Sequence, residues 1–423
     1  MIDLEWWQWG LLLTLPTFFA FGWIAARIDI KQLMHESRAL PRSYFEGLNF
    51  LLNEKQDKAI ESFIEAARVD PETVEIHFAL GSLFRRRGEV DRAIQVHQHL
   101  IERDGLRVDQ RLHALAELGQ DFLKAGLLDR AEAVFLKLRG TDLDDEALTY
   151  LLEIFQQEKE WVKAIDIAQA MPAHAGHLWQ KEIAQFRCEL AAVQILNDHL
   201  EDARTLLEMA LADNRKCVRA TILLGDVAAR VGADKTTAPR TTALQGGRAK
   251  DALLAVADGD TPIEIWKRVE QQNPDYLALV AQKLMQMYTE LERAEQGLNL
   301  LRDYLARYPS LDMLDAVFEA ELKNSGPQAA YIMVRDELRR NQTLLGLDKL
   351  LQAQLLAGPE TTPERRGDIE LVKDLIHNHT RRVARYRCDD CGFKARQFYW
   401  RCPGCGAWES YPPRRSEEFD ITP

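Results

Sequence analysis

Four cysteines near the end of the chain have the spacing of a metal site. Cys388 and Cys391 form one C-x-x-C pair, and Cys402 and Cys405 form a second pair after ten intervening residues. Two thiolates separated by two residues can bind one ion from a tight turn, and two such turns complete a tetrahedron around it. The sequence therefore predicts that these four cysteines bind a single metal ion.

The residues around the two pairs agree with this interpretation. Gly392 and Gly406 each follow the second cysteine of a pair, where a residue without Cβ can turn and direct its N–H toward a thiolate. The segment is too short to build a sufficient core, so metal binding would supply its folding free energy. Two disulfides are disfavoured because the low cysteine content fits a reducing compartment. A thioredoxin-type redox pair would need a βαβ context, which this sequence lacks.

The identity of the metal is left open between iron and zinc, since four sulfur donors suit both. The "CDDCG" and "CPGCG" segments are similar to the knuckles of rubredoxin, which holds one iron, but far fewer residues separate them. We therefore expect a structural site rather than an electron-transfer site. His377 and His379 lie close by, but four thiolates already complete the ligand set, so neither is expected to bind the metal.

A repeat of 34 residues organises the middle of the chain. Gly47 and Gly81 are separated by this interval, and so are Phe50 and Phe84. These offsets resemble the tetratricopeptide repeat, in which small residues lie where two helices cross and large residues fill the groove between them. The second copy has His97 where a large apolar residue is usual. The series predicts an all-α fold, an α-solenoid over residues 28–355, with an irregular helical bundle as the alternative.

Several shorter segments complete the predicted organisation. Residues 232–247 are polar and turn-forming, so we predict a loop inserted into the solenoid over about residues 232–249. Residues 356–385 are predicted to form a linker with helical character, residues 386–413 the metal-binding domain, and residues 414–423 a tail. Cys188 and Cys217 lie inside helical patterns and are expected to be buried as small apolar residues.

No segment has the pattern of a reaction centre. The sequence lacks G-x-x-x-x-G-K-[ST], H-E-x-x-H and G-x-S-x-G motifs. Solenoids present long surfaces that bind proteins. We therefore expect a binding protein and not an enzyme.

The first 27 residues are predicted to form a transmembrane anchor. From Trp6 to Ala26 the chain carries no charge, and these 21 residues would span about 31 Å as a helix. A cleaved signal peptide is disfavoured because the preceding residues include Asp3 and Glu5 but no Lys or Arg. A buried core helix is the remaining alternative.

The residues expected at the membrane interface are Trp6, Trp7, Trp9, Trp23 and Arg27. Since basic residues follow the apolar segment, the N-terminus is expected outside and the bulk of the chain in the cytoplasm.

The end of the chain differs in charge from the rest. The whole chain has a formal net charge of −12, so its bulk is not expected to bind nucleic acid. Residues 381–415 are instead rich in arginine, with interleaved aromatic residues that include Trp400 and Trp408. This segment could bind RNA, face anionic lipid or dock on the acidic solenoid. We expect docking, with the buried aromatic side chains contributing more than any single arginine.

The order of anchor, repeats and cysteine pairs resembles the lipopolysaccharide assembly protein B family of Gram-negative bacteria. The "RCDDCGF…WRCPGCGAW" segment is the strongest match and places the metal ligands of the family at the four cysteines. The resemblance implies a single-pass inner-membrane regulator with a periplasmic N-terminus. It further implies that the membrane protease FtsH, the LpxC deacetylase of lipid A synthesis and other lipopolysaccharide-assembly proteins are its partners. Homodimerisation is left open.

Three functions remain to be distinguished by the structure. The first is an adaptor that brings a protease and its substrate together. The second is a membrane-tethered electron-transfer component that uses a thiolate-bound iron. The third is an RNA-binding scaffold that uses the four-cysteine domain.

Overall fold

The computed structural model describes residues 41–171, 179–237, 261–358 and 362–417. The predicted anchor and its interface residues, Trp6, Trp7, Trp9, Trp23 and Arg27, lie outside this part of the chain. Among the described helices, none combines the length and apolar character needed to cross a membrane.

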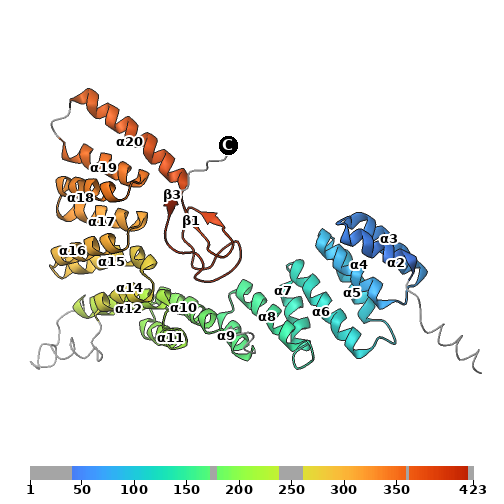
Figure 1. Cartoon of the computed structure of the whole chain (residues 1–423). Helices are drawn as coiled ribbons and strands as arrows, with labels where there is room; N and C mark the ends of the chain where they lie inside the picture. The colour runs from blue at the N-terminus through green and yellow to red at the C-terminus, as the bar shows by residue number, and fades with distance from the viewer. Residues whose placement is uncertain (1–40, 172–178, 238–260, 359–361, 418–423) are drawn as a thin grey trace, which may run out of the picture. The chain divides into compact units, whose positions relative to one another are not determined.

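The chain divides into two compact units, whose bounds are Met1–Gln157 and Glu158–Pro423. In each unit, helices that follow one another in sequence pack side by side (Figure 1). This arrangement confirms the predicted helical solenoid. The helices of the first unit are α2 (Arg42–Leu52), α3 (Gln56–Val69), α4 (Val74–Arg87), α5 (Val90–Ile101), α6 (Val108–Lys124), α7 (Leu128–Lys137) and α8 (Asp144–Glu158).

The second unit continues the solenoid and adds a small sheet. Its helices are α9 (Trp161–Ala170), α10 (Gln180–Leu196), α11 (Leu200–Asp213), α12 (Val218–Thr237), α14 (Pro262–Gln272), the 3-10 turn η1 (Pro274–Tyr276), α15 (Leu277–Glu290), α16 (Ala294–Arg307), α17 (Leu311–Asn324), α18 (Pro327–Arg340), α19 (Leu344–Ala357) and α20 (Pro363–Val383). The apolar side chains buried between these helices form one large core, which comes mainly from α12, α14, α15, α16 and α17.

Close helix crossings explain why a glycine recurs at the same place in successive repeats. A Cβ at Gly47 would lie 3.0 Å from the ring of Phe63, and one at Gly119 would lie 2.6 Å from the ring of Phe135. Both rings are buried. In each pair, glycine on the first helix leaves room for a large ring on the second, which is the packing that the repeat predicts.

His97 takes the place of the large apolar ring in the second repeat. A Cβ at Gly81 would lie 2.4 Å from the His97 ring, so the same close crossing is kept. The ring Nδ1 pairs with an Asp121 carboxylate oxygen at 2.5 Å, and Arg85 donates to the other Asp121 oxygen at 2.7 Å. His97 and Asp121 are fully buried, so their polar atoms need these partners.

The predicted inserted loop begins later than the sequence pattern indicates. Residues 232–237 are helical, because α12 continues to Thr237. Residues 238–249 of the predicted loop lie outside the described chain. The next helix among the described residues, α14, begins with a capping box between Thr261 and Glu264.

The C-terminal segment forms a small three-stranded sheet that we call the ribbon. Its strands are β1 (Ala384–Arg387), β2 (Lys394–Ala395) and β3 (Ser416–Glu417), in the antiparallel order β2-β1-β3. The sheet extends beyond the predicted range 386–413, because β3 lies in the predicted tail. Most of the predicted linker over residues 356–385 belongs to α20. Figure 1 shows the ribbon inside the arc of helices from α10 to α17.

Candidate metal centre

The structure brings the four cysteine sulfurs of the ribbon together. All four Sγ atoms lie within 4.8 Å of one another. Cys388 and Cys405 are 3.8 Å apart, and Cys391 and Cys402 are 3.6 Å apart. A tetrahedral ion with bonds of about 2.3 Å to sulfur requires sulfur–sulfur distances of about 3.8 Å. The donor atoms therefore have the type and the spacing that one four-coordinate iron or zinc ion needs.

The two cysteine pairs are held by the same backbone turn. The N–H of Gly392 donates to the carbonyl of Cys388, and the N–H of Gly406 donates to the carbonyl of Cys402, both at 2.9 Å. The two glycines have φ values of 74° and 75°, a left-handed conformation that glycine adopts without strain. The requirement for glycine after each pair is thus conformational.

Hydrogen bonds to sulfur favour the thiolate form of one ligand. Burial opposes ionisation of Cys388, but its side-chain hydrogen bond with Ser410 and the backbone N–H groups of Cys391 and Asp390 outweigh it and lower its pKa to about 6. The N–H of Gly404 also points at the Cys402 sulfur, at 3.4 Å. Because the thiolate is the form that binds metals, this environment suits a metal ligand.

The remaining sulfurs need a cation to ionise together. The N–H of Phe393 lowers the pKa of Cys391, but burial and the neighbouring cysteine sulfurs outweigh it and raise this pKa to about 12. Adjacent thiolates repel one another, and a divalent ion between them removes that penalty. Cys388 and Cys402 are buried, whereas Cys391 and Cys405 are exposed.

Trp408 inserts the ribbon between two helices of the solenoid. Its ring centroid lies 6.3 Å from Trp161 of α9 and 6.1 Å from Phe186 of α10, both in edge-on geometry. The Trp408 side chain is only 6% exposed. The guanidinium of Arg219 on α12 lies 5.9 Å from the same ring. Such contacts combine apolar burial with cation–π attraction.

Trp400 makes a second aromatic contact between ribbon and solenoid. Its ring stacks on Tyr276 of η1, with centroids 5.5 Å apart and an interplanar angle of 14°. The guanidinium of Arg219 lies 5.6 Å from this ring as well. The predicted docking of the basic segment on the solenoid is therefore confirmed. Trp400 and Trp408 both lie within this contact.

A half-buried polar contact lies beside Trp408. Gln185 of α10 donates to the Glu409 carboxylate at 2.6 Å. Its amide also lies 3.4 Å from the Cys217 sulfur, which is 3.9 Å from the Cys188 sulfur. Burial raises the pKa of the Glu409 carboxyl group above its ordinary value. Cys188 and Cys217 are fully buried in the solenoid, as predicted, and they contribute nothing to the metal cluster.

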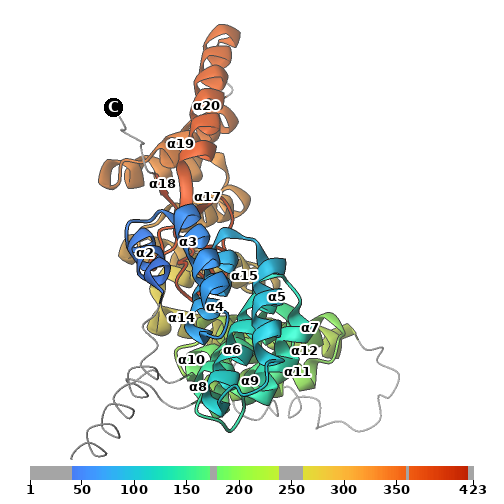
Figure 2. The same cartoon turned by 90° about the vertical axis from the view of Figure 1, so that its right-hand side faces the viewer.

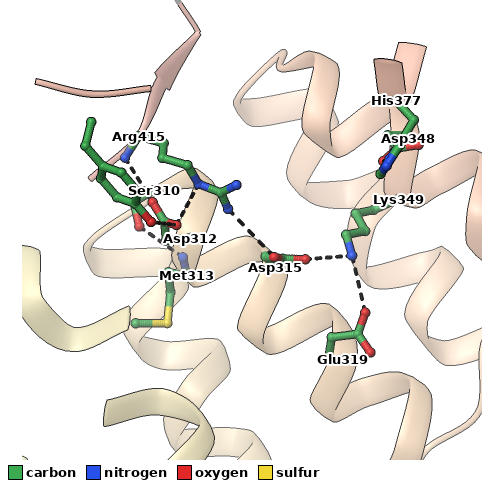
Figure 3. Close-up of polar contacts among 10 residues, drawn as sticks. Ser310, Asp312, Met313, Asp315, Glu319, Asp348, Lys349, His377 and Arg415 are labelled. Atoms are coloured by element: carbon green, nitrogen blue, oxygen red, sulfur yellow. Dashed lines mark hydrogen bonds and ion pairs between the residues drawn. The ribbon is translucent and has the colours of Figure 1, made fainter. Parts of the chain in front are cut away.

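Asp312 of α17 holds the strands of the ribbon from the other side. One of its oxygens accepts from the backbone N–H of Arg415 at 2.9 Å, and the other from the Tyr386 hydroxyl at 3.0 Å and from Arg415 Nε at 2.7 Å. Figure 3 shows Arg415 between Asp312 and Asp315, and Lys349 between Asp315 and Glu319. The Arg415 contacts supply the attraction between basic ribbon and acidic solenoid that the sequence suggested.

Some residues of this contact carry no signal in the sequence. Gln185, Glu409 and Asp312 belong to no motif and become neighbours only through the fold. His377, which was not expected to bind the metal, pairs through Nδ1 with Asp348 at 3.0 Å and lies outside the sulfur cluster.

A repeat solenoid that carries a docked four-cysteine ribbon defines a tetratricopeptide-repeat scaffold with a rubredoxin-type metal domain. Residues 386–412 match the model of the rubredoxin metal binding domain, and residues 46–104 match the tetratricopeptide repeat. The chain is 34% identical over 410 residues to lipopolysaccharide assembly protein B of Escherichia coli, which covers 96% of this chain and 98% of that protein. This chain therefore belongs to the lipopolysaccharide assembly protein B family.

The chain is also similar to two further proteins. The protein of the same name from Haemophilus influenzae is 29% identical over 428 residues, which covers 97% of this chain and 99% of that protein. Among solved structures, the C-terminal part of a TPR repeat-containing protein from Cytophaga hutchinsonii covers 69% of this chain and 98% of its own, at 12% identity and a TM-score of 0.35.

Proposed function

We propose that this chain is an inner-membrane adaptor that limits lipid A synthesis by promoting degradation of the LpxC deacetylase by the membrane protease FtsH. It also gathers other lipopolysaccharide-assembly proteins. The observation that carries the proposal is the similarity over 96% of this chain to a protein named for lipopolysaccharide assembly. The finer assignment of FtsH and LpxC as partners rests on the family resemblance.

The architecture supports an adaptor. Helical repeats provide an extended surface for partner proteins, as solenoids generally do. The ribbon contacts α9, α10, α12, η1 and α17, so one small domain joins helices that are far apart in sequence. A metal ion bound by the four cysteines would stabilise the ribbon and thereby the shape of this part of the solenoid. The metal has a structural role in this proposal.

The proposal is tested by the lifetime of LpxC in a Gram-negative strain whose own copy of this gene can be depleted. The wild-type chain should restore rapid LpxC turnover, and the double variant Cys388→Ser/Cys402→Ser should lengthen the LpxC half-life several-fold. The matched control is Arg396→Ser, which changes an exposed ribbon residue outside the ligand set. When FtsH is also depleted, the variants should no longer differ. If the wild-type chain leaves the LpxC half-life unchanged, the proposal is wrong.

One observation favours electron transfer as a second candidate function. Two of the four sulfurs, those of Cys391 and Cys405, are exposed, and exposed ligands allow close approach of a redox partner. The test is voltammetry of the iron-loaded full chain. A reversible one-electron wave at a reduction potential that cytoplasmic redox partners can reach would support this candidate. An irreversible response, or a chain that contains only zinc when isolated from cells, would exclude it.

A further inference from the structure

The two cysteines outside the metal cluster lie against each other in the solenoid. Cys188 is in α10, and Cys217 lies directly before the first residue of α12, yet their sulfurs are 3.9 Å apart. Both side chains are fully buried. Helices α10 and α12 pack on each other and on α11, and α11 and α12 lie next to each other in both views (Figure 1 and Figure 2). The fold thus brings into contact two thiols that are 29 positions apart in sequence.

The distance between these sulfurs is suited to disulfide formation. A disulfide has an S–S bond of about 2.05 Å, so the two sulfurs need to approach each other by roughly 1.9 Å. Rotation about the two Cα–Cβ bonds changes this distance without breaking either helix. In a reducing compartment, the disulfides that do occur are commonly transient and redox-sensing. The pair therefore has the geometry of a reversible modification site.

A polar residue of α10 links the cysteine pair to the ribbon. Gln185 lies three residues before Cys188 and therefore shares a face of α10 with it. Its Nε2 donates to the Glu409 carboxylate of the ribbon at 2.6 Å and lies 3.4 Å from the Cys217 sulfur. One amide group thus contacts both the ribbon and the pair, so the ribbon covers this side of the pair.

Trp408 packs on the two segments that carry the cysteines. Phe186 lies two residues before Cys188, and its ring centroid is 6.1 Å from that of Trp408. Arg219 lies two residues after Cys217, and its guanidinium is 5.9 Å from the same ring. Release of Trp408 would therefore open the solenoid at the place where the two thiols lie.

We propose that Cys188 and Cys217 form a reversible disulfide, and that the docked ribbon controls the access of the oxidant, a peroxide. The sulfur of one cysteine attacks a peroxide oxygen, the O–O bond breaks, and the thiol proton leaves with the other oxygen as water. The other sulfur attacks the resulting sulfenic acid, the S–S bond forms as the S–O bond breaks, and a second water leaves. Two thiols and one hydrogen peroxide thus give one disulfide and two waters.

The docked ribbon keeps the pair reduced. Burial raises the pKa of the Cys188 thiol, and its hydrogen bond with Cys217 raises this pKa further. Because the thiolate is the form that attacks peroxide, a thiol in this environment reacts slowly. The disulfide would therefore mark chains whose ribbon had been released, and thiol exchange would reverse it. This inference does not depend on the proposed function.

Peptide mapping of the full chain under non-reducing conditions tests the proposal. The metal-loaded chain in detergent micelles is treated with hydrogen peroxide, free thiols are alkylated, and the digest is analysed by mass spectrometry. Peptides joined through Cys188 and Cys217 should form slowly in the wild type and at least about tenfold faster in Trp408→Ala, because local opening exposes the pair. A thiol reductant should separate them. Rates are compared while the metal content stays at one ion per chain, so that oxidation of the cluster does not contribute.

Matched variants separate access from unfolding. Tyr399→Ala, at an exposed position of the same ribbon, should react at the wild-type rate. Trp400→Ala removes the second aromatic contact and should also accelerate the reaction. Helical circular dichroism should stay unchanged in all variants.

Two outcomes would overturn the proposal. If the folded wild-type, Trp408→Ala and Trp400→Ala chains all yield no joined peptides, Cys188 and Cys217 are only buried apolar residues. If the joined peptides form at one rate in all three chains, the ribbon does not control access to the pair.

Discussion

At the level of single residues, two short turns determine the chemistry of this protein. Each turn holds two sulfurs, and each depends on a glycine with positive φ. The hydrogen bonds that favour ionisation of Cys388 involve Ser410 and the backbone of the turn itself. All four metal ligands therefore come from one short segment of the chain. The other residues of the ribbon determine where this segment docks on the solenoid.

Removal of two ligands should abolish metal binding without unfolding the solenoid. The double variant Cys388→Ser/Cys405→Ser takes one sulfur from each pair, and two remaining thiolates cannot hold the ion. Metal analysis of the purified chain should fall from one ion per chain to less than about one tenth, since the site needs its full ligand set. Helical circular dichroism should change little. A full equivalent of metal in the double variant would contradict the assignment.

Glu409→Gln should stabilise the docked ribbon at neutral pH. Burial raises the pKa of Glu409 in the folded chain above its value in the unfolded chain. Its contribution to stability is therefore fully present below the unfolded pKa and is lost as pH rises through the folded pKa. Glutamine can still accept the hydrogen bond from Gln185 and stays neutral, so we expect a melting temperature at pH 7 that is about 1–3 °C higher.

Glu292→Gln is the matched control for this experiment. Glu292 has the same left-handed backbone conformation as Glu409, with φ values of 57° and 53°, but it is exposed. Its substitution should leave the melting temperature unchanged. If Glu409→Gln lowers the melting temperature at pH 7, the buried carboxylate is stabilising and the sign of this argument is wrong.

At the level of secondary-structure elements, the ribbon and the solenoid form one structural unit. Aromatic contacts at Trp400 and Trp408 lie on one side of the ribbon, and the Asp312 contacts with Tyr386 and Arg415 lie on the other. Two separate attachment points restrain the ribbon more than either alone, because a single contact would leave rotation about it.

Trp408→Ala should detach this side of the ribbon. Truncation of a buried tryptophan to alanine typically lowers stability by about 3–5 kcal/mol. We expect a loss of this size to release the contact between this side of the ribbon and the solenoid. We expect faster cleavage of the ribbon in limited proteolysis, while metal content stays at one ion per chain. Tyr399→Ala, which truncates an aromatic side chain that is 37% exposed on the same ribbon, should have no such effect.

Trp408→Phe separates packing from hydrogen bonding at this position. Within the described part of the chain, the Trp408 indole N–H has no hydrogen-bond partner. Phenylalanine should therefore keep most of the protection from proteolysis. Equal cleavage of the alanine variant and the wild type would show that the aromatic contact is dispensable for docking.

At the level of the whole molecule, the position of the charges around the first apolar segment predicts topology. Arg27 and further basic residues follow this segment, and acidic residues precede it. A reporter that is active only in the cytoplasm should therefore be active when fused to the C-terminus. A periplasmic reporter fused at the same place should be inactive. Activity of the periplasmic reporter would reverse the predicted orientation.

The sequence alone determined the features that depend on local spacing. The C-x-x-C pairs and their glycines predicted both knuckles, because a tight turn brings residues that are close in sequence into contact. Glycine and aromatic residues recurring every 34 residues predicted the helical pairs, since each pair packs by the same local rule. The similarity to lipopolysaccharide assembly protein B was recognised from the order of these parts, and the comparison confirmed it.

Only the tertiary structure decided how distant segments meet. Gln185 and Glu409 are separated by 224 positions, and Asp312 and Arg415 by 103 positions. Such pairs follow no periodicity, because their distance depends on the summed geometry of all the helices between them. The start of the inserted loop was misplaced because polar residues in 232–237 are equally compatible with an exposed helix. Local spacing thus specifies the knuckles and the repeats, whereas the contacts that join them depend on the accumulated curvature of the solenoid.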